Sequence, residues 1–387
     1  MNKKELELYI HIPFCVKKCS YCDFLSAPAT EQTREAYMAA LFAEIGGRAK
    51  EYRDRIVTSL FIGGGTPSLL SGEQILQLME RIRAQFVLAE DAEITMEVNP
   101  GTATAQKLWE FYGAGINRLS IGMQSAQAQE LKTLGRIHDF EGFCQVYREA
   151  VAAGFTNINV DVMSGLPGQT LASYKDTLEK VLHLEPMPQH ISAYSLIVEE
   201  GTPFAAMAER GQLPLPEEDT ERAMYEETIE VLEKYGFHRY EISNYARPGY
   251  ECRHNVGYWV RRDYLGFGIG AASLIDNVRF QNGRDLTAYL AHPLDCREEE
   301  QSLTTQEQME ETLFLGLRLT KGVSYDAFAR QYGSSLQEVY GEVIAHNVAD
   351  GLLQVTEGEE NGESRRFLAL TKRGLDLSNY VMAQFLF

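Results

Sequence analysis

The sequence predicts an α/β fold in which a parallel sheet is followed by a smaller, mostly helical domain. Short β-rich apolar runs alternate with amphipathic segments through residues 1–240. Such alternation indicates parallel strands, because parallel neighbours need a crossover connection. The alternation fades from about residue 250, and the chain of 387 residues exceeds the roughly 250 to 300 residues at which single cores stop growing. Two domains are therefore expected.

Six β-rich runs are the predicted strands. They cover residues 8–14, 57–65, 94–100, 117–125, 157–168 and 190–198. The first helix is expected within residues 34–49, where Tyr37, Leu41 and Ile45 recur every four residues and form one face. Further helical patterns cover residues 73–86, 103–113, 139–153, 171–184 and 218–235. Six βα units suit either a doubly wound sheet or a barrel, which could be complete or partial. Periodicity alone does not decide between these folds.

Polar and glycine-rich residues gather where the predicted strands end. They are Gly63, Gly64, Gly65, Thr66, Glu97, Asn99, Gln124, Ser125, Asp161 and Tyr194. The carboxyl ends of parallel strands share one edge, so the sequence predicts a functional site there.

The C-terminal part is expected to be a separate, winged-helix-like module. Residues 1–240 form the predicted core domain, residues 241–302 a connecting segment and residues 303–387 the helical domain. Helices are expected at 305–319, 324–332 and 336–350, followed by a short hairpin over 352–371 and a final helix. The acidic stretch EEEQSLTTQEQMEE from residue 298 opposes contact with nucleic acid phosphates.

Charge and hydropathy exclude several classes of partner. Fifty-five acidic against thirty-six basic residues give a formal charge of -19, which disfavours nucleic acid and anionic lipid surfaces. No apolar stretch of roughly 18 residues predicts a membrane span, and no signal-like segment opens the chain. We expect a cytoplasmic protein whose six cysteines are reduced.

Three of those cysteines are clustered in YIHIPFCVKKCSYCDF, at Cys15, Cys19 and Cys22. Structural zinc normally needs four ligands, and His11 could be the fourth beside the three cysteines. A cubane iron–sulfur cluster fits better, because three cysteines can hold three irons and leave the fourth open to another ligand. Three buried cysteines without metal are the plainest alternative.

The C-x3-C-x2-C spacing, with Tyr21 before the last cysteine, resembles the radical S-adenosylmethionine (SAM) superfamily. In order along the chain, GGGTPS, EVNP, IGMQS, LGRIHD and DVMSGLPGQT resemble its oxygen-independent coproporphyrinogen oxidase branch. The resemblance implies a partial (β/α)6 barrel, a [4Fe-4S] cluster on the three cysteines and SAM on its open iron.

The resemblance also implies which residues hold these cofactors. Glu97, Gln124, Arg136 and Asp161 match positions that hold the amino group, ribose or carboxylate of SAM. The remaining predicted cofactor residues are Tyr9, His11, Tyr21, Gly64, Gly65 and Thr66. Taken singly, each could equally be a turn, capping or core residue.

Two departures separate this chain from the true oxidases, which carry a further cysteine where Phe24 stands and a longer segment before the cluster. The chain instead resembles the related HemW heme chaperones, including their HNxxYW motif within CRHNVGYW at residues 252–259. That motif implies heme contact at His254, since imidazole is a good axial ligand for iron. The plainer alternative is that His254 is a hydrogen-bonded structural histidine.

The expected function is therefore a heme chaperone with a SAM-coordinated cluster. Its implied partners are heme, a heme-acceptor protein of respiratory type and an electron donor for the cluster. The alternatives are an oxygen-independent coproporphyrinogen III oxidase or another radical SAM tetrapyrrole enzyme, and a radical SAM enzyme that modifies tRNA. Whether the protein is an enzyme stays open, and coproporphyrinogen oxidase activity is not expected.

Overall fold

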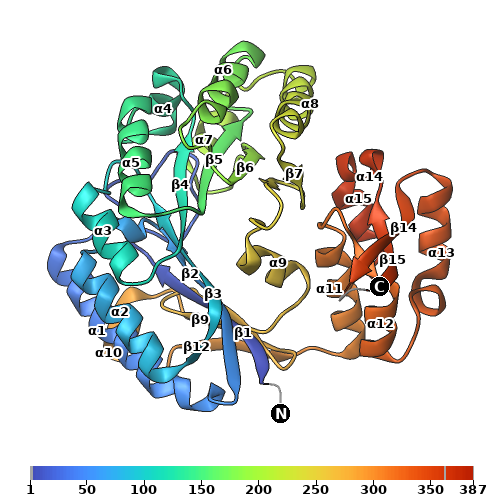
Figure 1. The fold of residues 1–387 in the computed structure, drawn as a ribbon, viewed down its shortest axis with the longest axis horizontal. Helices are drawn as coiled ribbons and strands as arrows, with labels where there is room; N and C mark the ends of the chain where they lie inside the picture. The colour runs from blue at the N-terminus through green and yellow to red at the C-terminus, as the bar shows by residue number, and fades with distance from the viewer. Residues whose placement is uncertain (1–2, 361–362, 387) are drawn as a thin grey trace.

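A computed structural model describes residues 3–360 and 363–386. A curved sheet with helices on its outer face forms the larger part, and the C-terminal residues form a smaller body beside it (Figure 1). The predicted division into a sheet domain and a mostly helical domain is thus confirmed.

Six parallel strands lie side by side in chain order. They are β1 (Lys4–Ile12), β2 (Arg55–Gly64), β3 (Val87–Val98), β4 (Arg118–Gln124), β5 (Ile158–Ser164) and β6 (His190–Ser195). A doubly wound sheet would reverse its strand order at a switch point, and this run of six does not. The sheet continues at both ends into further strands and does not close on itself. The fold is the partial barrel.

Helices follow each strand, and most of them cover the convex face of the sheet (Figure 1). They are α1 (Glu31–Arg48), α2 (Gly72–Gln85), α3 (Ala105–Gly113), α4 (Ala128–Leu134), α5 (Phe140–Ala153), α6 (Leu171–Leu182), α7 (Pro203–Glu209) and α8 (Glu218–Lys234), with short 3-10 turns at Ala49–Tyr52 and Pro67–Leu69. The six helices expected here all form. The sequence missed α4 and α7, since seven residues are too few for a helical period to stand out.

Alternation along each strand separates an apolar outer face from a polar inner face. On β1, for example, Leu6, Leu8 and Ile10 belong to the core under the helices, whereas Glu7 and Tyr9 alternate with them. The equivalent inner positions of the other strands include Ser59, Phe61, Glu93, Thr95, Glu97, Arg118, Ser120, Gly122, Asn159, Asp161, His190 and Ser192. The interior of the barrel therefore carries polar and charged side chains.

Residues 238–302 add strands to both ends of the parallel sheet. On the β6 side lie β8 (Asn244–Ala246) and β7 (His238–Arg239); on the β1 side lie β9 (Tyr264–Phe267), β10 (Ala272–Ile275), β11 (Val278–Asn282) and β12 (Arg297–Ser302). Two helices, α9 (Arg253–Trp259) and α10 (Leu286–Ala291), lie between them in the chain. The sequence expected only a connecting segment here, and its boundaries at 240 and 302 stay a prediction.

The C-terminal body has its own apolar core. Its helices are α11 (Thr305–Gly316), α12 (Tyr325–Tyr332), α13 (Leu336–Ala349), α14 (Lys372–Asp376) and α15 (Ser378–Ala383), and its small sheet contains β13 (Val323–Ser324), β14 (Leu353–Glu360) and β15 (Glu363–Leu370). The three expected helices and the hairpin are confirmed, and the expected final helix is divided in two. No helix among the described residues is long and apolar enough to cross a bilayer.

Candidate functional site

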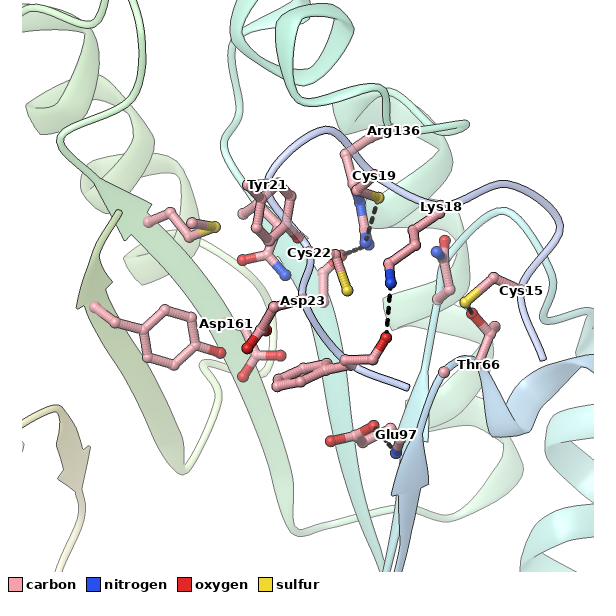
Figure 2. Close-up of a pocket in the computed structure, with 18 of the residues that line it drawn as sticks. Cys15, Lys18, Cys19, Tyr21, Cys22, Asp23, Thr66, Glu97, Arg136 and Asp161 are labelled. Atoms are coloured by element: carbon pink, nitrogen blue, oxygen red, sulfur yellow. Dashed lines mark hydrogen bonds between the residues drawn. The ribbon is translucent and has the colours of Figure 1, made fainter. Parts of the chain in front are cut away.

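A cavity of about 400 Å³ opens at the carboxyl ends of the parallel strands. Its roof is the cysteine loop, residues 13–30, which joins β1 to α1. Figure 2 shows Cys15, Cys19 and Cys22 on this loop, with Glu97 and Asp161 on the strands beneath it. The site therefore lies at the sheet edge that the strand-end residues predict.

Backbone hydrogen bonds hold the cysteine loop over the strand ends. The amide of Cys15 donates to Ala27 O over 3.1 Å, and the amide of Ser20 donates to Leu134 O over 3.0 Å. The amide of Phe204 in turn donates to Ser20 O over 3.0 Å. The loop is fixed by its main chain on both sides of Cys19, so its path does not depend on the cysteine side chains.

The three thiols are free, partly exposed and face the cavity. The hydroxyl of Thr66 donates to Cys15 Sγ over 3.4 Å, and Arg136 Nη1 lies 3.9 Å from Cys19 Sγ. Among residues 3–360 and 363–386, no three His, Cys, Asp or Glu side chains are arranged to hold a single metal ion. A cubane takes one thiolate on each of three irons, and three soft sulfur donors around one cavity fit that requirement.

Two carboxylates, Glu97 on β3 and Asp161 on β5, line the floor of the cavity. Burial and the nearby charge of Asp161 raise the pKa of Glu97 to about 8. The Gly64 amide donates to Glu97 Oε2 over 3.0 Å, and this hydrogen bond opposes the rise in pKa. Burial also raises the pKa of Asp161, which accepts a hydrogen bond from Asn159 Nδ2 over 2.6 Å. Such a pair favours a cationic ligand, because a positive charge would relieve both the burial cost and the mutual repulsion.

Gln124 and Arg136 complete the cavity wall, and Arg136 lies against the cysteine loop beside Cys19 (Figure 2). Gln124 has a positive φ of 70° at the end of β4, and its buried Oε1 has no hydrogen-bond partner among the described residues. The buried Nε of Arg136 also has none among them, while its Nη2 donates to the Gly122 carbonyl oxygen. These unsatisfied atoms fit a ligand that carries both a hydrogen-bond donor and a carboxylate.

Gly65 allows β2 to approach the cysteine loop closely. A Cβ at this position would lie 2.7 Å from Phe14 O and 2.9 Å from Ile12 O, which are backbone atoms that cannot turn aside. The Gly65 amide donates to Ile12 O over 2.8 Å. The glycine therefore fixes the distance between the strand end and the start of the loop.

We expect Gly65→Ala to lower the free energy of unfolding by about 1–3 kcal/mol, because the added methyl group must displace the start of the loop. Gly113→Ala is the matched control: its Cβ would meet nothing within 4 Å, so it should be neutral or slightly stabilising. Urea denaturation of both variants measures the difference. Equal stabilities for the two variants would show that the loop adapts freely.

Tyr9 and His11 lie beside this cavity and line a neighbouring one with Gly64 and Glu97. The hydroxyl of Tyr9 is 3.0 Å from His11 Nδ1, and His11 Nε2 is 2.8 Å from Leu25 O. Both ring nitrogens of His11 are thus engaged within the protein. Of the other strand-end residues predicted from the sequence, Gly63 and Ser125 are not among those that line the first cavity, whereas the rest line it together with Tyr21.

His254 is not among the residues that line either cavity. It is 1% exposed, with Nδ1 2.8 Å from Ser59 Oγ and Nε2 3.1 Å from the hydroxyl of Tyr258. Its ring stacks on Phe61 at 5.2 Å between centroids, and burial lowers its pKa to about 3. The arrangement is that of a neutral, hydrogen-bonded histidine inside the barrel, and its predicted contact with heme would require Tyr258 to move.

Sequence reasoning missed the residues that complete the neighbouring cavity. Tyr264 and Arg284 come from the region of β9 to α10, where no strands were expected. Met163 and Ser120 line the first cavity from β5 and β4. Met163 lies two residues from Asp161 on β5, and Ser120 four residues from Gln124 on β4. This even spacing along a strand was the signal that could have found them.

Comparisons with known proteins agree with this geometry. The family described as the radical SAM superfamily matches residues 9–181, and the HemN C-terminal domain matches residues 303–377. The chain is 36% identical over 387 residues to heme chaperone HemW of Lactococcus lactis, covering 100% of this chain and 98% of that protein. It is 39% identical over 385 residues to heme chaperone HemW of Bacillus subtilis, covering 98% of each.

One solved structure resembles nearly the whole chain. Coproporphyrinogen III oxidase (HemN) from Escherichia coli, described as a radical SAM enzyme, superposes with a TM-score of 0.83 at 27% identity. The match covers 99% of this chain and 90% of that one. The two-part architecture is therefore shared, including the C-terminal domain.

Proposed function

This chain belongs to the HemW family of the radical SAM superfamily, and from that premise we propose that it is a heme chaperone. It binds heme and passes it to an acceptor protein, and it carries a [4Fe-4S] cluster whose open iron binds SAM. The names of the curated relatives support the heme part of this proposal. The donor set of the first cavity supports the cluster and SAM.

One observation carries the cofactor assignment: three free thiols face two carboxylates with raised pKa across the same cavity. Thiolates are the ligands of iron–sulfur clusters, and the paired carboxylates suit the positive charge of the sulfonium and amino groups of SAM. When bound, the SAM-ligated cluster supplies one-electron reductive cleavage of SAM.

Different residues of the cavity would hold the cluster and SAM. Cys15, Cys19 and Cys22 would hold three irons, with Thr66 and Arg136 donating toward two of the sulfurs. Such donors stabilise negative charge on the cluster ligands.

SAM would lie along the strand ends beneath the cluster. Glu97 and Asp161 would bind its amino group and ribose hydroxyls, and Gln124 with Arg136 its carboxylate. Gly64 and Gly65 let the backbone come close to it, and Tyr21 lies against the same cavity. Electrons for the cluster would come from a separate donor protein.

A radical SAM tetrapyrrole enzyme is the second candidate, favoured by the likeness to HemN over 99% of the chain. Phe24 argues against this second candidate, because the true oxidases carry a further cysteine at this position. Phe24 lines the cavity and is 60% exposed. We propose the chaperone as the primary function, in the cytoplasm, with a respiratory protein as the acceptor and no role in nucleic acid binding.

We expect the cluster-loaded protein to bind about one heme per chain in an anaerobic titration followed by the Soret band. Incubation with coproporphyrinogen III, SAM and a reductant should give no product that has lost propionate carboxyls. Absence of saturable heme binding would refute the chaperone, and decarboxylated product would establish the enzyme.

His254 is included in this titration as His254→Gln, which keeps a polar side chain inside the barrel. If His254 binds heme after Tyr258 moves, the variant should change the position of the Soret band, since an axial imidazole sets the spectrum. An unchanged spectrum would mean that His254 does not bind the heme iron and has only a structural role, through its hydrogen bonds to Ser59 and Tyr258.

A further inference from the structure

A second cavity of about 400 Å³ lies next to the first, on the β1 and β9 side of the cysteine loop. The two cavities share four lining residues: Asp23, Phe24, Gly64 and Glu97. The volume is typical of small-molecule sites. A ligand here would touch the same side chains as a ligand in the first cavity, so the two sites are adjacent compartments of one opening.

The inner wall of the second cavity is aromatic. Tyr9, Tyr258 and Tyr264 all line it and all are partly exposed. The rings of Tyr258 and Tyr264 meet edge to face, with centroids 4.7 Å apart at 88°. Aromatic faces held rigidly by neighbouring rings offer a flat, apolar surface to a conjugated ligand.

Arg284 supplies a positive charge at the rim. It is exposed, and among the described residues lining this cavity it is the sole lysine or arginine. No hydrogen bond or ion pair within the described chain engages its guanidinium. A guanidinium matches a carboxylate in a two-pronged geometry. The cavity therefore combines an aromatic wall with a cation that is available to a ligand.

Glycine at position 270 keeps this part of the cavity open. Gly270 has a φ of +65°, and a Cβ there would lie 2.6 Å from Leu25 Cδ2 and 3.8 Å from Arg284 Cγ. A side chain would occupy the space between the cysteine loop and Arg284.

We propose that this second cavity takes the propionate-bearing edge of heme, with a pyrrole ring against the tyrosine wall and a propionate on Arg284. The inference rests on the proposed function, since it places the heme that a chaperone would carry. His254 lies behind Tyr258 in this arrangement, and both nitrogens of His11 are engaged. Arg284 and the tyrosines, rather than an imidazole, make the first contact.

The test compares heme with its dimethyl ester, which lacks the propionate charges, on the cluster-loaded protein under anaerobic conditions. Wild type should bind heme about tenfold or more tightly than the ester, because a charge-assisted pair is lost with the ester. Arg284→Gln should weaken heme binding by the same factor and leave ester binding unchanged. Arg148→Gln, an exposed arginine on the outer helix α5, is the matched control and should behave as wild type.

The outcomes separate the two proposals. Heme binding that is intact in Arg284→Gln overturns the anchor and leaves the chaperone standing. If Arg284→Gln weakens the binding of heme and of its ester equally, the anchor is also overturned. The arginine would then contribute through its shape and not through a contact with the propionate carboxylate. Failure of the wild type to bind heme at all refutes the chaperone and the anchor together.

Discussion

We expect the Cys19→Ala variant to fold but not to retain the proposed iron–sulfur cluster. Cys19 faces the first cavity from a loop that main-chain bonds of Ser20 hold to Leu134 and Phe204. In the proposed cluster, removal of the thiol would therefore take a ligand from one iron without releasing the loop. A cubane left with two protein thiolates loses an anchor at one of its three protein-bound irons.

Iron and sulfide analysis after anaerobic reconstitution measures this effect. Wild type should contain about four irons per chain, and Cys19→Ala about none after removal of excess iron. Cys144→Ala is the control, since Cys144 is a free, partly buried thiol on α5 outside the cavity. Far-ultraviolet circular dichroism checks that each variant is folded. A full iron content in Cys19→Ala would rule out the three-cysteine cluster.

Replacement of Glu97 by glutamine should have opposite effects on SAM binding and on stability. In the cluster-loaded protein the variant should bind SAM about 10 to 100 times more weakly, because an ion pair with the amino group becomes a neutral hydrogen bond. Isothermal titration calorimetry measures the change. Glu90→Gln, at an exposed position nearer the start of β3, should bind SAM as wild type does.

The stability effect follows from the raised pKa of Glu97, which is about 8 against 4.5 for an ordinary glutamate. Between these values the folded protein holds a proton that the unfolded chain releases, so the free energy of unfolding falls as pH rises. Glutamine has no proton to lose. Relative to wild type, the stability of the cluster-free variant should increase from pH 4.5 upward, by on the order of 4 kcal/mol near pH 8.

Denaturant unfolding at several pH values tests this difference. Glu7, whose pKa burial also raises to about 8, titrates in the same window in both proteins and cancels in the comparison. A gap between variant and wild type that does not change with pH would mean that Glu97 is ionised throughout. The stabilised variant would then need another explanation.

The sequence predicted the parallel strands well, because their alternation and their strand-end residues are local signals. Tyr9, Glu97 and Asp161 each fall on the inner face of a strand, where the period of two places them. The strands beyond residue 241 were missed because β8 and β9 have only three and four residues. Their pairing is fixed by contacts with β6 and β1, which are far away in the chain.

The surroundings of His254 could not be predicted for the same reason. Its partners include Ser59 and Phe61 on β2, and its amide donates to Glu93 on β3. These residues come together only when α9 enters the barrel. A motif shows which residue types are neighbours in the chain, whereas burial depends on elements some two hundred positions away.

The pairing of β1 with β9 also sets an order of assembly during synthesis. The six parallel strands and the first cavity can form once the chain has passed β6, but one edge of β1 stays unpaired until β9 has left the ribosome. An open edge strand is a template for pairing with other chains. The nascent protein therefore passes through an interval in which its cysteine loop is already in place while one edge of β1 still lacks its partner strand. We expect chaperone binding or aggregation to occur mainly during this interval.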